Sequence, residues 1–350
     1  MRASCSVHTA ELIEMEVDYS SEFISAPIPD SLWCEVERLY NSVFSSKVML
    51  VSVDNDAETL HAWVEKTLQQ ISTILLFQKK GCVIYVANEV IEISSEVIKR
   101  FSKIIFSKFS DIHCIRFHAV ILEQPLKDSL LRTSIFSEDY VLKLPTTKEQ
   151  WIASLSARAR EKLRSYLRRA LNEKNGIQFI ALKNTEIDEK DVRSVIRLNQ
   201  LRMIKKRKNY GMTVAEEGQL CEQIKKGGLL FLLKKDNVIC AGFICTALGT
   251  DVFMHVLAHD PAFDKLRLGL VCCSKTIEHL ISLNYQHLHF LWGHYDYKKQ
   301  MGAKPVDLSR VLVIKGIGYE LLHPIIMGLW YVTKARDQLR KLRHKRASKI

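Results

Sequence analysis

Hydrophobic positions along the first third of the chain follow a mixture of helical and strand-like periods, which predicts an α+β module. The apolar residues of Ser94–Phe109 recur at helical spacing, and Ser94 or Ser95 is a suitable cap for that helix. The predicted helices are residues 31–44, Glu58–Ile71 and Ser94–Phe109. The predicted strands are Lys47–Val53, Thr73–Gln78, Cys82–Ala87 and Ile112–Leu122, with Lys79-Lys80-Gly81 as the turn of a hairpin.

A connector, Pro125–Ser137, and a strand, Asp139–Leu144, lead to a strongly patterned helix. Thr147 with Gln150 three residues later forms a capping-box signature, which opens a helix that we expect to run to about Lys174. Apolar residues recur every four positions and predict its buried face: Trp151, Leu155, Ala159, Leu163 and Leu167. The opposite face carries arginines that form either a solvated surface or a contact surface for phosphates or nucleic acid: Arg158, Arg160, Arg164, Arg168 and Arg169.

The second half of the chain predicts two helices, an antiparallel meander of strands, and a further helix after a loop. Turns at Lys235-Asp236-Asn237 and Gly249-Thr250 separate the strands of the meander, and Asp260–Leu268 is predicted to be irregular. The predicted helices are Asp188–Lys208, Val214–Lys226 and Gly269–Leu283. The predicted strands are Ile177–Leu182, Leu229–Lys234, Val238–Leu248, Asp251–His259, His287–Leu291 and Arg310–Lys315.

Composition narrows the class of protein. A length of 350 residues allows two domains. The nine cysteines include no C-x-x-C pair, which fits a reducing compartment. The first twenty residues carry Glu11, Glu14, Glu16 and Asp18, a pattern unlike a signal peptide, and the apolar stretch Leu321–Val332 is too short to span a bilayer. We therefore expect a cytoplasmic protein.

The net charge of +12 indicates acidic partners: nucleotide phosphates, an acyl carrier protein, RNA or an anionic membrane surface. Much of this charge is local, since Lys334–Lys349 contains Asp337 as its only acid. The residues before it include Leu329 and Trp330. This tail is either a helix packed on the domain with a solvated basic end, or a basic helix lying on the inner face of an anionic membrane.

The order of the second-half elements, with a glycine at the start of the helix that follows the meander, is the order of a GNAT domain. Gly269 starts that helix, and its free N–H groups can accept a pyrophosphate closely, with Lys265 and Arg267 adding charge. More specific segments are Tyr140-Val-Leu-Lys-Leu-Pro145, Ala241-Gly242-Phe243, His259-Asp260-Pro261, and Phe290-Leu291-Trp292-Gly293 followed by Tyr297-Lys298 and Gly302. With these, residues from about Asp139 to Lys315 resemble the GNAT-like acyltransferases typified by the cellulose-biosynthesis protein CelD, a family similar to the FemAB peptidyltransferases.

The resemblance implies tandem GNAT-like domains: residues 1–136 as a degenerate GNAT-like domain, 137–318 as the acyltransferase domain and 319–350 as the basic tail. It implies a cleft where two neighbouring central strands splay apart. An acyl thioester of coenzyme A, or of an acyl carrier, would lie there with Arg267, Gly269 and Leu270 as its binding residues. An amine would attack the thioester carbonyl, which the backbone of the strand Asp251–His259 would polarise.

Candidate side chains follow from this implied cleft. Alternation along the strand is expected to place Phe253, His255, Leu257 and His259 on one face, with His255 or His259 as the base. Tyr297 would protonate the leaving thiolate. The expected acceptor-binding residues are Trp292, His294, Asp296 and Lys298. We expect no metal, because neither His287 with His289 nor His255 with His259 has a cysteine or carboxylate to complete a ligand set.

Three hypotheses follow. The first is an N-acyltransferase acting on an amine of a polysaccharide or cell-envelope precursor, with no nucleic-acid partner. The second is a FemAB-like transferase using aminoacyl-tRNA, which the basic residues of Arg158–Arg169 and Lys205–Lys208 favour. The third is a GNAT-fold scaffold without catalysis, favoured by departures from the usual phosphate-loop pattern at Leu266 and Val271.

Overall fold

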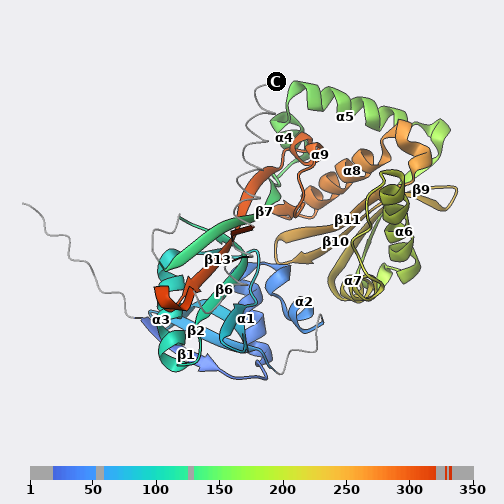
Figure 1. The fold of residues 1–350 in the computed structure, drawn as a ribbon. Coiled ribbons are helices and arrows are strands. Elements are labelled where there is room, and N and C mark those ends of the chain that lie inside the picture. Colours follow the sequence, from blue (N-terminus) through green and yellow to red (C-terminus); the bar gives the residue numbers. More distant parts are fainter. Residues whose placement is uncertain (1–18, 53–58, 125–129, 321–327, 329–330, 333–350) are drawn as a thin grey trace, which may run out of the picture.

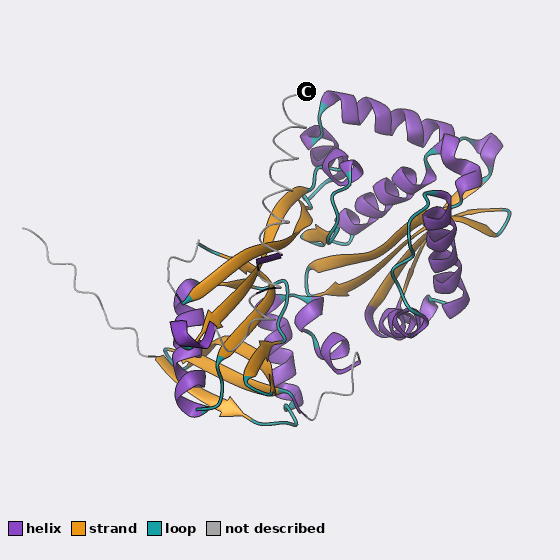
Figure 2. Cartoon of the chain, viewed as in Figure 1, coloured by secondary structure: helices purple, strands orange, loops and turns teal. Residues whose placement is uncertain are grey.

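The sheet of this protein is built from one arrangement used twice. The structure is a computed structural model that describes residues 19–52, 59–124, 130–320, 328 and 331–332 (Figure 1). Within those residues, thirteen strands form a mixed sheet, and Figure 2 shows helices covering it in both halves of the molecule. The first half comprises residues 19–124, and the second half residues 148–303.

In the first half, antiparallel strands are followed by a helix and a strand parallel to the last of them. β4 pairs with β6 in parallel register over three positions, from Val83 opposite Cys114 to Tyr85 opposite Arg116. The strands are β1 (Tyr19–Ile24), β2 (His61–Thr67), β3 (Gln70–Lys80), β4 (Val83–Val86), β5 (Glu92–Ile93) and β6 (Cys114–Leu122). The helices are α1 (Asp30–Tyr40), the short η1 (Val43–Ser45), α2 (Lys47–Ser52) and α3 (Ser95–Lys108).

The second half repeats this order. The antiparallel strands are β8 (Ile177–Lys183), β9 (Gly228–Lys235), β10 (Val238–Leu248) and β11 (Asp251–His259). They are followed by the turn η5 (Pro261–Leu266), the helix α8 (Leu268–Ser282) and the strand β12 (His287–His289), which is parallel to β11. The other helices are α4 (Lys148–Ser154), α5 (Ala157–Ala170), α6 (Glu189–Lys205), α7 (Val214–Gly227) and α9 (Asp296–Gln300). Short 3-10 turns lie at Glu173–Asn175, Asn184–Glu186 and Ile317–Glu320.

Two long strands exchange between the halves. β7 (Leu131–Lys143) leaves the first half and pairs with β12 of the second, whereas β13 (Lys304–Ile314) leaves the second half and pairs with β6 of the first. The two strands also pair with each other, so the sheet order is β1-β2-β3-β4-β6-β13-β7-β12-β11-β10-β9-β8. Figure 1 shows them as the connection between the halves. β7 thus crosses residue 136, where the sequence suggested a boundary.

Caps explain several helix starts. Ser94 accepts a hydrogen bond from the N–H of Val97 at the start of α3, and Thr147 accepts one from Gln150 at the start of α4. The single long helix expected from Thr147 to Lys174 is wrong. The chain is extended at Leu155 and Ser156, and Ser156 caps a second helix by accepting from the N–H of Ala159.

Two early predictions are also wrong. Lys47–Val53 was expected as a strand, but Lys47–Ser52 is the helix α2, because a short apolar run does not by itself distinguish a strand from a helix. Glu58–Ile71, expected as a helix, contains β2. Ala62 and Val64 of this strand are buried in one core and Trp63 in another, so its hydrophobic residues run without the alternation typical of a half-exposed strand.

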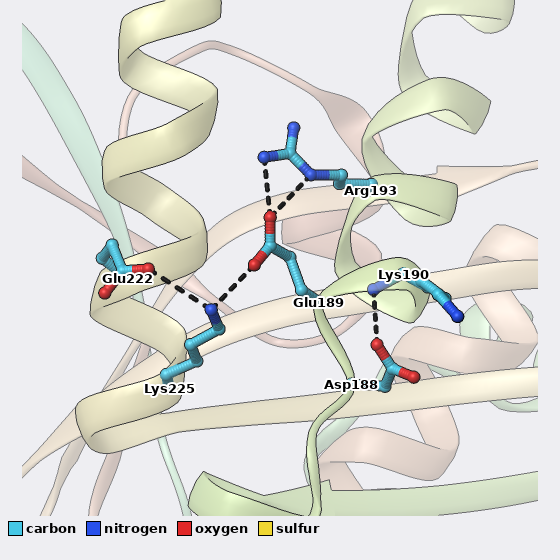
Figure 3. Close-up of polar contacts among 6 residues, drawn as sticks. All are labelled: Asp188, Glu189, Lys190, Arg193, Glu222 and Lys225. Carbon is cyan, nitrogen blue, oxygen red and sulfur yellow. Dashed lines mark hydrogen bonds and ion pairs between the residues drawn. The ribbon is translucent and has the colours of Figure 1, made fainter.

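The helix pair α6 and α7 packs on one face of the second half. Gly242 of β10 allows this close contact, since a Cβ there would lie 2.2 Å from Cγ2 of Val195 on α6. Figure 3 shows Glu189 at the start of α6 bound to Arg193 of the same helix and to Lys225 of α7, at 2.7 Å in each case. These ion pairs lie at the surface, so they orient the two helices but contribute little to the free energy of unfolding.

The predictions for the basic segment Lys334–Lys349 and for Trp330 lie outside the described residues. Within the part of the chain that the structure describes, no helix has the length and apolar character needed to cross a bilayer.

Candidate functional site

β11 and β12 separate near the middle of the second half. They pair over three positions, from Asp251 opposite His287 to Phe253 opposite His289. β12 then ends, while β11 continues to His259. Among the described strands, none pairs with this side of β11 beyond Phe253. Backbone groups on that edge are therefore available to a bound molecule.

A β-bulge lies in the open part of β11. Cys245 of β10 faces Met254 and Ile244 faces Val256, which leaves His255 without a partner across the ladder. Met254 accordingly packs in the core with α8, whereas Val256, two residues later, packs in the core with α6 and α7. The expectation that His255 and His259 share a face is therefore wrong, because the extra residue reverses the alternation.

On one side of the bulge lies a pocket of about 900 Å³, here called the cationic pocket. Five of its lining residues are cations and one is an acid: Arg169, Arg202, Lys206, Lys265, Arg267 and Asp264. The other lining residues are Tyr166, Leu257, His259, Gly269, Leu270 and Tyr297. The single acid is already neutralised, because Asp264 bonds Lys205 at 2.7 Å and His259 at 2.8 Å. These hydrogen bonds, first from Lys205 and then from His259, lower the pKa of Asp264.

Gly269 lets the start of α8 approach this pocket. A Cβ at this position would lie 3.0 Å from Nδ1 of His259, whose ring is fixed by its bond to Asp264. Arg267 directly before the helix has a positive φ of 56° and ends the turn η5. The loop thus presents two cations and the first turn of a helix to the same volume, an arrangement that suits phosphate groups.

Arg202 and Tyr297 form the inner wall of the cationic pocket. Burial lowers the pKa of Arg202, although a guanidinium remains charged, and its Nε has no hydrogen-bond partner. Burial raises the pKa of Tyr297, so its phenol keeps its proton at neutral pH. The phenol donates only a weak hydrogen bond, 3.7 Å long, to the sulfur of Met254. Both groups can therefore serve a ligand.

On the other side of the bulge lies a pocket of about 530 Å³, here called the inter-half pocket. Phe44 and Met49 line it from the first half of the chain. The second half supplies the α6–α7 connection, part of α7, and the residues His255, Val256, Leu291 and Trp292. Polar groups on this wall include Asn199, Asn209, Tyr210, Glu216, Gln219 and Gln223. The pocket can therefore hold a polar molecule next to the bulge.

His255 lies at the boundary of the inter-half pocket. Its Nε2 is 2.8 Å from the hydroxyl of Thr246. Burial lowers the pKa of His255 to about 4, so the imidazole is neutral at physiological pH. His259, in contrast, lies in the cationic pocket and is paired with Asp264. The structure thus separates the two histidines that the sequence offered for the same role.

Comparisons with known proteins agree with this geometry. Residues 157–299 match the family of the acetyltransferase (GNAT) domain. This range includes both of the strands that separate, β11 and β12. This match lies within the second half of the chain and gives that half a GNAT domain fold. A search of curated proteins finds no match to the sequence.

Solved structures show the same fold over most of the chain. FemX matches with a TM-score of 0.63 at 10% identity, over 87% of this chain and 99% of that one. A conserved protein of unknown function from Bacteroides thetaiotaomicron matches with a TM-score of 0.54 at 10% identity, over 85% and 100%. L-PGS from Bacillus licheniformis matches with a TM-score of 0.51 at 14% identity, over 89% and 98%. The predicted tandem GNAT-like fold is confirmed, and the narrower resemblance to CelD stays a prediction.

The predicted site residues fall into separate groups around the GNAT domain. Arg267, Gly269, Leu270 and Tyr297 line the cationic pocket together with His259, and Trp292 lines the inter-half pocket with His255. His294 lies apart from both pockets, with Nδ1 2.6 Å from the phenol of Tyr140. Asp296 is exposed at the start of α9.

Lys298 is not exposed to either pocket. Its side chain is buried, and Nζ donates to the carbonyl oxygens of Leu291 at 2.7 Å and Trp292 at 3.0 Å. Burial lowers the pKa of Lys298 to about 8, against an opposing effect of Asp139. Lys298 therefore fixes the backbone that carries Trp292 into the inter-half pocket.

Sequence reasoning missed a chain of charges beside the opened strands. His289 on β12 donates to Asp139 of β7 at 2.6 Å and faces Asp251 of β11 at 3.6 Å. Asp251 in turn accepts from His287 at 2.9 Å. These carboxylates come from strands far apart in sequence, so only the β7 exchange brings them together. Among the described residues, no cluster of three or more His, Cys, Asp or Glu side chains could hold a metal ion.

Arg169, Arg202 and Lys206 are the other functional candidates that sequence reasoning did not single out for a donor site. Their signal was present, since each lies near the basic C-terminal end of a predicted helix. What was absent was the knowledge that the ends of α5 and α6 meet the start of α8.

Proposed function

We propose that this protein is an N-acyltransferase that binds an acyl thioester in the cationic pocket and an amine in the inter-half pocket. The observation that supports this most directly is the bulge of β11. It places two pockets of different character on opposite sides of one strand whose edge is unpaired. A transferase needs this topology, because donor and acceptor must meet at one carbonyl carbon.

The cationic pocket suits a donor with phosphate groups. Its charges, the helix start at Gly269 and the free Nε of Arg202 would bind the phosphates, while Leu257 and Leu270 would contact the acyl arm. Val271, which departs from the usual phosphate-loop pattern, is fully buried in the core and does not line the pocket. Val271 would therefore not obstruct a donor in this pocket.

The reaction can be written with this chain's own groups. The amine nitrogen forms a bond to the thioester carbonyl carbon, and backbone N–H groups on the open edge of β11 stabilise the oxyanion. The carbon–sulfur bond then breaks. His255, neutral and on the acceptor side, takes the proton released by the nitrogen, and Tyr297, protonated and on the donor side, gives a proton to the thiolate.

We place the acceptor among amines of polysaccharide or cell-envelope precursors, with coenzyme A or an acyl carrier protein bearing the acyl group. The resemblance of the segments around Phe290-Leu291-Trp292-Gly293 to CelD-like proteins supports this, as does the fold shared with FemX and L-PGS. Association with the inner face of a membrane through the basic tail remains part of the same proposal.

A second candidate function uses aminoacyl-tRNA as the donor. The fold match to FemX and the cations of the cationic pocket favour it. Salt-sensitive binding of charged tRNA that competes with acyl-CoA would support this candidate, and indifference to tRNA would exclude it.

The first experiment is calorimetric binding of acetyl-CoA and a longer acyl-CoA to the purified protein, with Gly269→Trp as the test variant. A matched control is Gly218→Trp, since a Cβ at Gly218 on α7 meets no atom within 4 Å. We expect saturable binding that is lost in Gly269→Trp and retained in Gly218→Trp. Equal binding to both variants would show that the donor site is misplaced, and no binding to the unaltered protein would refute a coenzyme A donor.

A further inference from the structure

α5 carries cations that have no acidic partner among the described residues. Arg158, Lys162 and Arg169 are exposed, and none of them forms an ion pair there. The contrast with α6 and α7 is clear in Figure 3, where Glu189 neutralises both Arg193 and Lys225. Unpaired like charges on one helix repel each other, so they are best explained by an acidic partner that binds them.

The three cations lie on one face of the helix. Their positions are four and seven residues apart, which is the spacing of one side of an α-helix. At a rise of about 1.5 Å per residue the row extends roughly 16 Å from Arg158 to Arg169. We call Arg158, Lys162 and Arg169 the basic stripe.

The stripe connects two concave regions. Arg169 at one end lines the cationic pocket. Arg158 and Lys162 at the other end line a depression of about 450 Å³, to which α9 adds Lys299 and Gln300. The cations of the cationic pocket are sufficient to bind the phosphates of a free nucleotide. Arg158 and Lys162, at the other end of the stripe, would then contact no part of the ligand. A larger acidic partner would use both ends.

From this we infer that the basic stripe is the docking surface for an acidic acyl carrier protein, which inserts its phosphopantetheine-linked acyl group into the cationic pocket. This inference rests on the proposed function, because it assigns the donor of the same reaction. Rim charges of this kind act mainly on the rate and salt dependence of association.

The composition of the stripe favours a protein over a nucleic acid. Single-stranded nucleic acids bind to basic grooves in which aromatic side chains stack on the bases. The exposed residues between the cations of α5 are small or charged, and its one aromatic, Tyr166, is directed to the cationic pocket. A helix of a small acidic protein can lie along a row of this length and pair with each cation.

The test compares an acylated acyl carrier protein with the acyl-CoA of the same chain length as donors. The variant is Arg158→Glu with Lys162→Glu, both outside the cationic pocket. The matched control is Lys99→Glu with Lys103→Glu, an exposed pair of equal spacing on α3 in the first half. Affinity is measured by surface plasmon resonance at two salt concentrations, and kcat/KM for each donor is measured in parallel.

We expect the α5 variant to weaken carrier-protein binding by about tenfold or more and to leave kcat/KM for acyl-CoA unchanged. The α3 control should behave like the unaltered protein. Equal carrier binding by the α5 variant, or an equal loss in the α3 control, would overturn the inference. The inference would also be overturned if the protein bound tRNA in a salt-sensitive way and did not bind the carrier protein, and if the α5 variant abolished that tRNA binding. If acyl-CoA and the acylated carrier both fail as donors, the proposed function fails first.

Discussion

His289 should make the stability of this protein depend on pH, and the sign can be worked out from its surroundings. Burial disfavours the charged imidazole, but the hydrogen bond to Asp139 and the nearby carboxylate of Asp251 outweigh burial and raise the pKa of His289 to about 9. In the unfolded chain a histidine titrates near 6.5. The folded state therefore retains a proton that the unfolded state loses, so this contribution is complete below pH 6.5 and declines as pH rises towards 9.

The magnitude follows from the interval between the two pKa values. Lys298, whose pKa is lowered to about 8, contributes in the opposite direction above that pH, so the clearest interval is pH 6.5–8. Over those 1.5 units the free energy of unfolding should fall by about 1–1.5 kcal/mol, because the limit is about 1.36 kcal/mol per unit, the unfolded histidine is half protonated at pH 6.5, and Lys298 offsets part of the change near pH 8. His255 and His279 have lowered pKa values, so their effects lie below this interval.

The assay is urea denaturation at pH 6.5, 7.0, 7.5 and 8.0, with Asp139→Asn as the test variant and His279→Asn as the control. The Asp139→Asn protein should be less stable than the unaltered protein at each of these pH values. At pH 6.5 the loss should be about 3 kcal/mol, because the buried charge of His289 loses its partner. The stability of this variant should also change less with pH. His279→Asn should keep the slope of the unaltered protein. A flat profile in the unaltered protein, or an equal slope in Asp139→Asn, would refute the reasoning.

Three further predictions concern packing and the proposed site. Gly242→Ala should lower the free energy of unfolding by about 1–3 kcal/mol, since its Cβ would lie 2.2 Å from Cγ2 of Val195. Val195→Ala in the same chain should recover part of this loss. If urea denaturation shows that the effects of the two substitutions simply add, the contact is contradicted. Tyr297→Phe should reduce kcat by about a hundredfold while the dissociation constant for acyl-CoA is unchanged, and an unaltered kcat would remove Tyr297 as the proton donor. Arg202→Met should weaken acyl-CoA binding about tenfold in calorimetry, and equal affinity would show that its charge is not used.

Much of the second half could be predicted from the sequence, because its signals are local. The antiparallel meander, the helix after it and the position of Gly269 depend on turns, periodicity and a helix start that a short window contains. Ser94 and Thr147 were recognisable as caps for the same reason. β2 was not predictable in this way, because burial of both of its faces removes the alternation that marks a strand.

The arrangement of the site could not be predicted because it depends on long-range pairing. The bulge at His255 is set by its register with β10, and nothing in the sequence Met254-His255-Val256 marks it. The pairing of Asp139 with His289 needs β7 to cross into the second half, a step that joins residues 150 positions apart. The family resemblance implied a tandem arrangement, but the repeated order of strands and helices is seen only in the structure.

Comparison of the two halves explains why the site lies in the second. Both halves pair a meander strand with a later parallel strand over three positions and then let the two strands separate. In the first half the gap is closed again, because Val90 and Ile91 exchange backbone hydrogen bonds with Ala119 and Ile121 of β6. In the second half the residues that follow β11 form the turn η5 and the helix α8 and pair with no strand, so among the described strands the edge of β11 stays open beyond Phe253. The chain after β11 therefore leaves the second gap accessible, while the first half supplies Phe44 and Met49 to the pocket beside it.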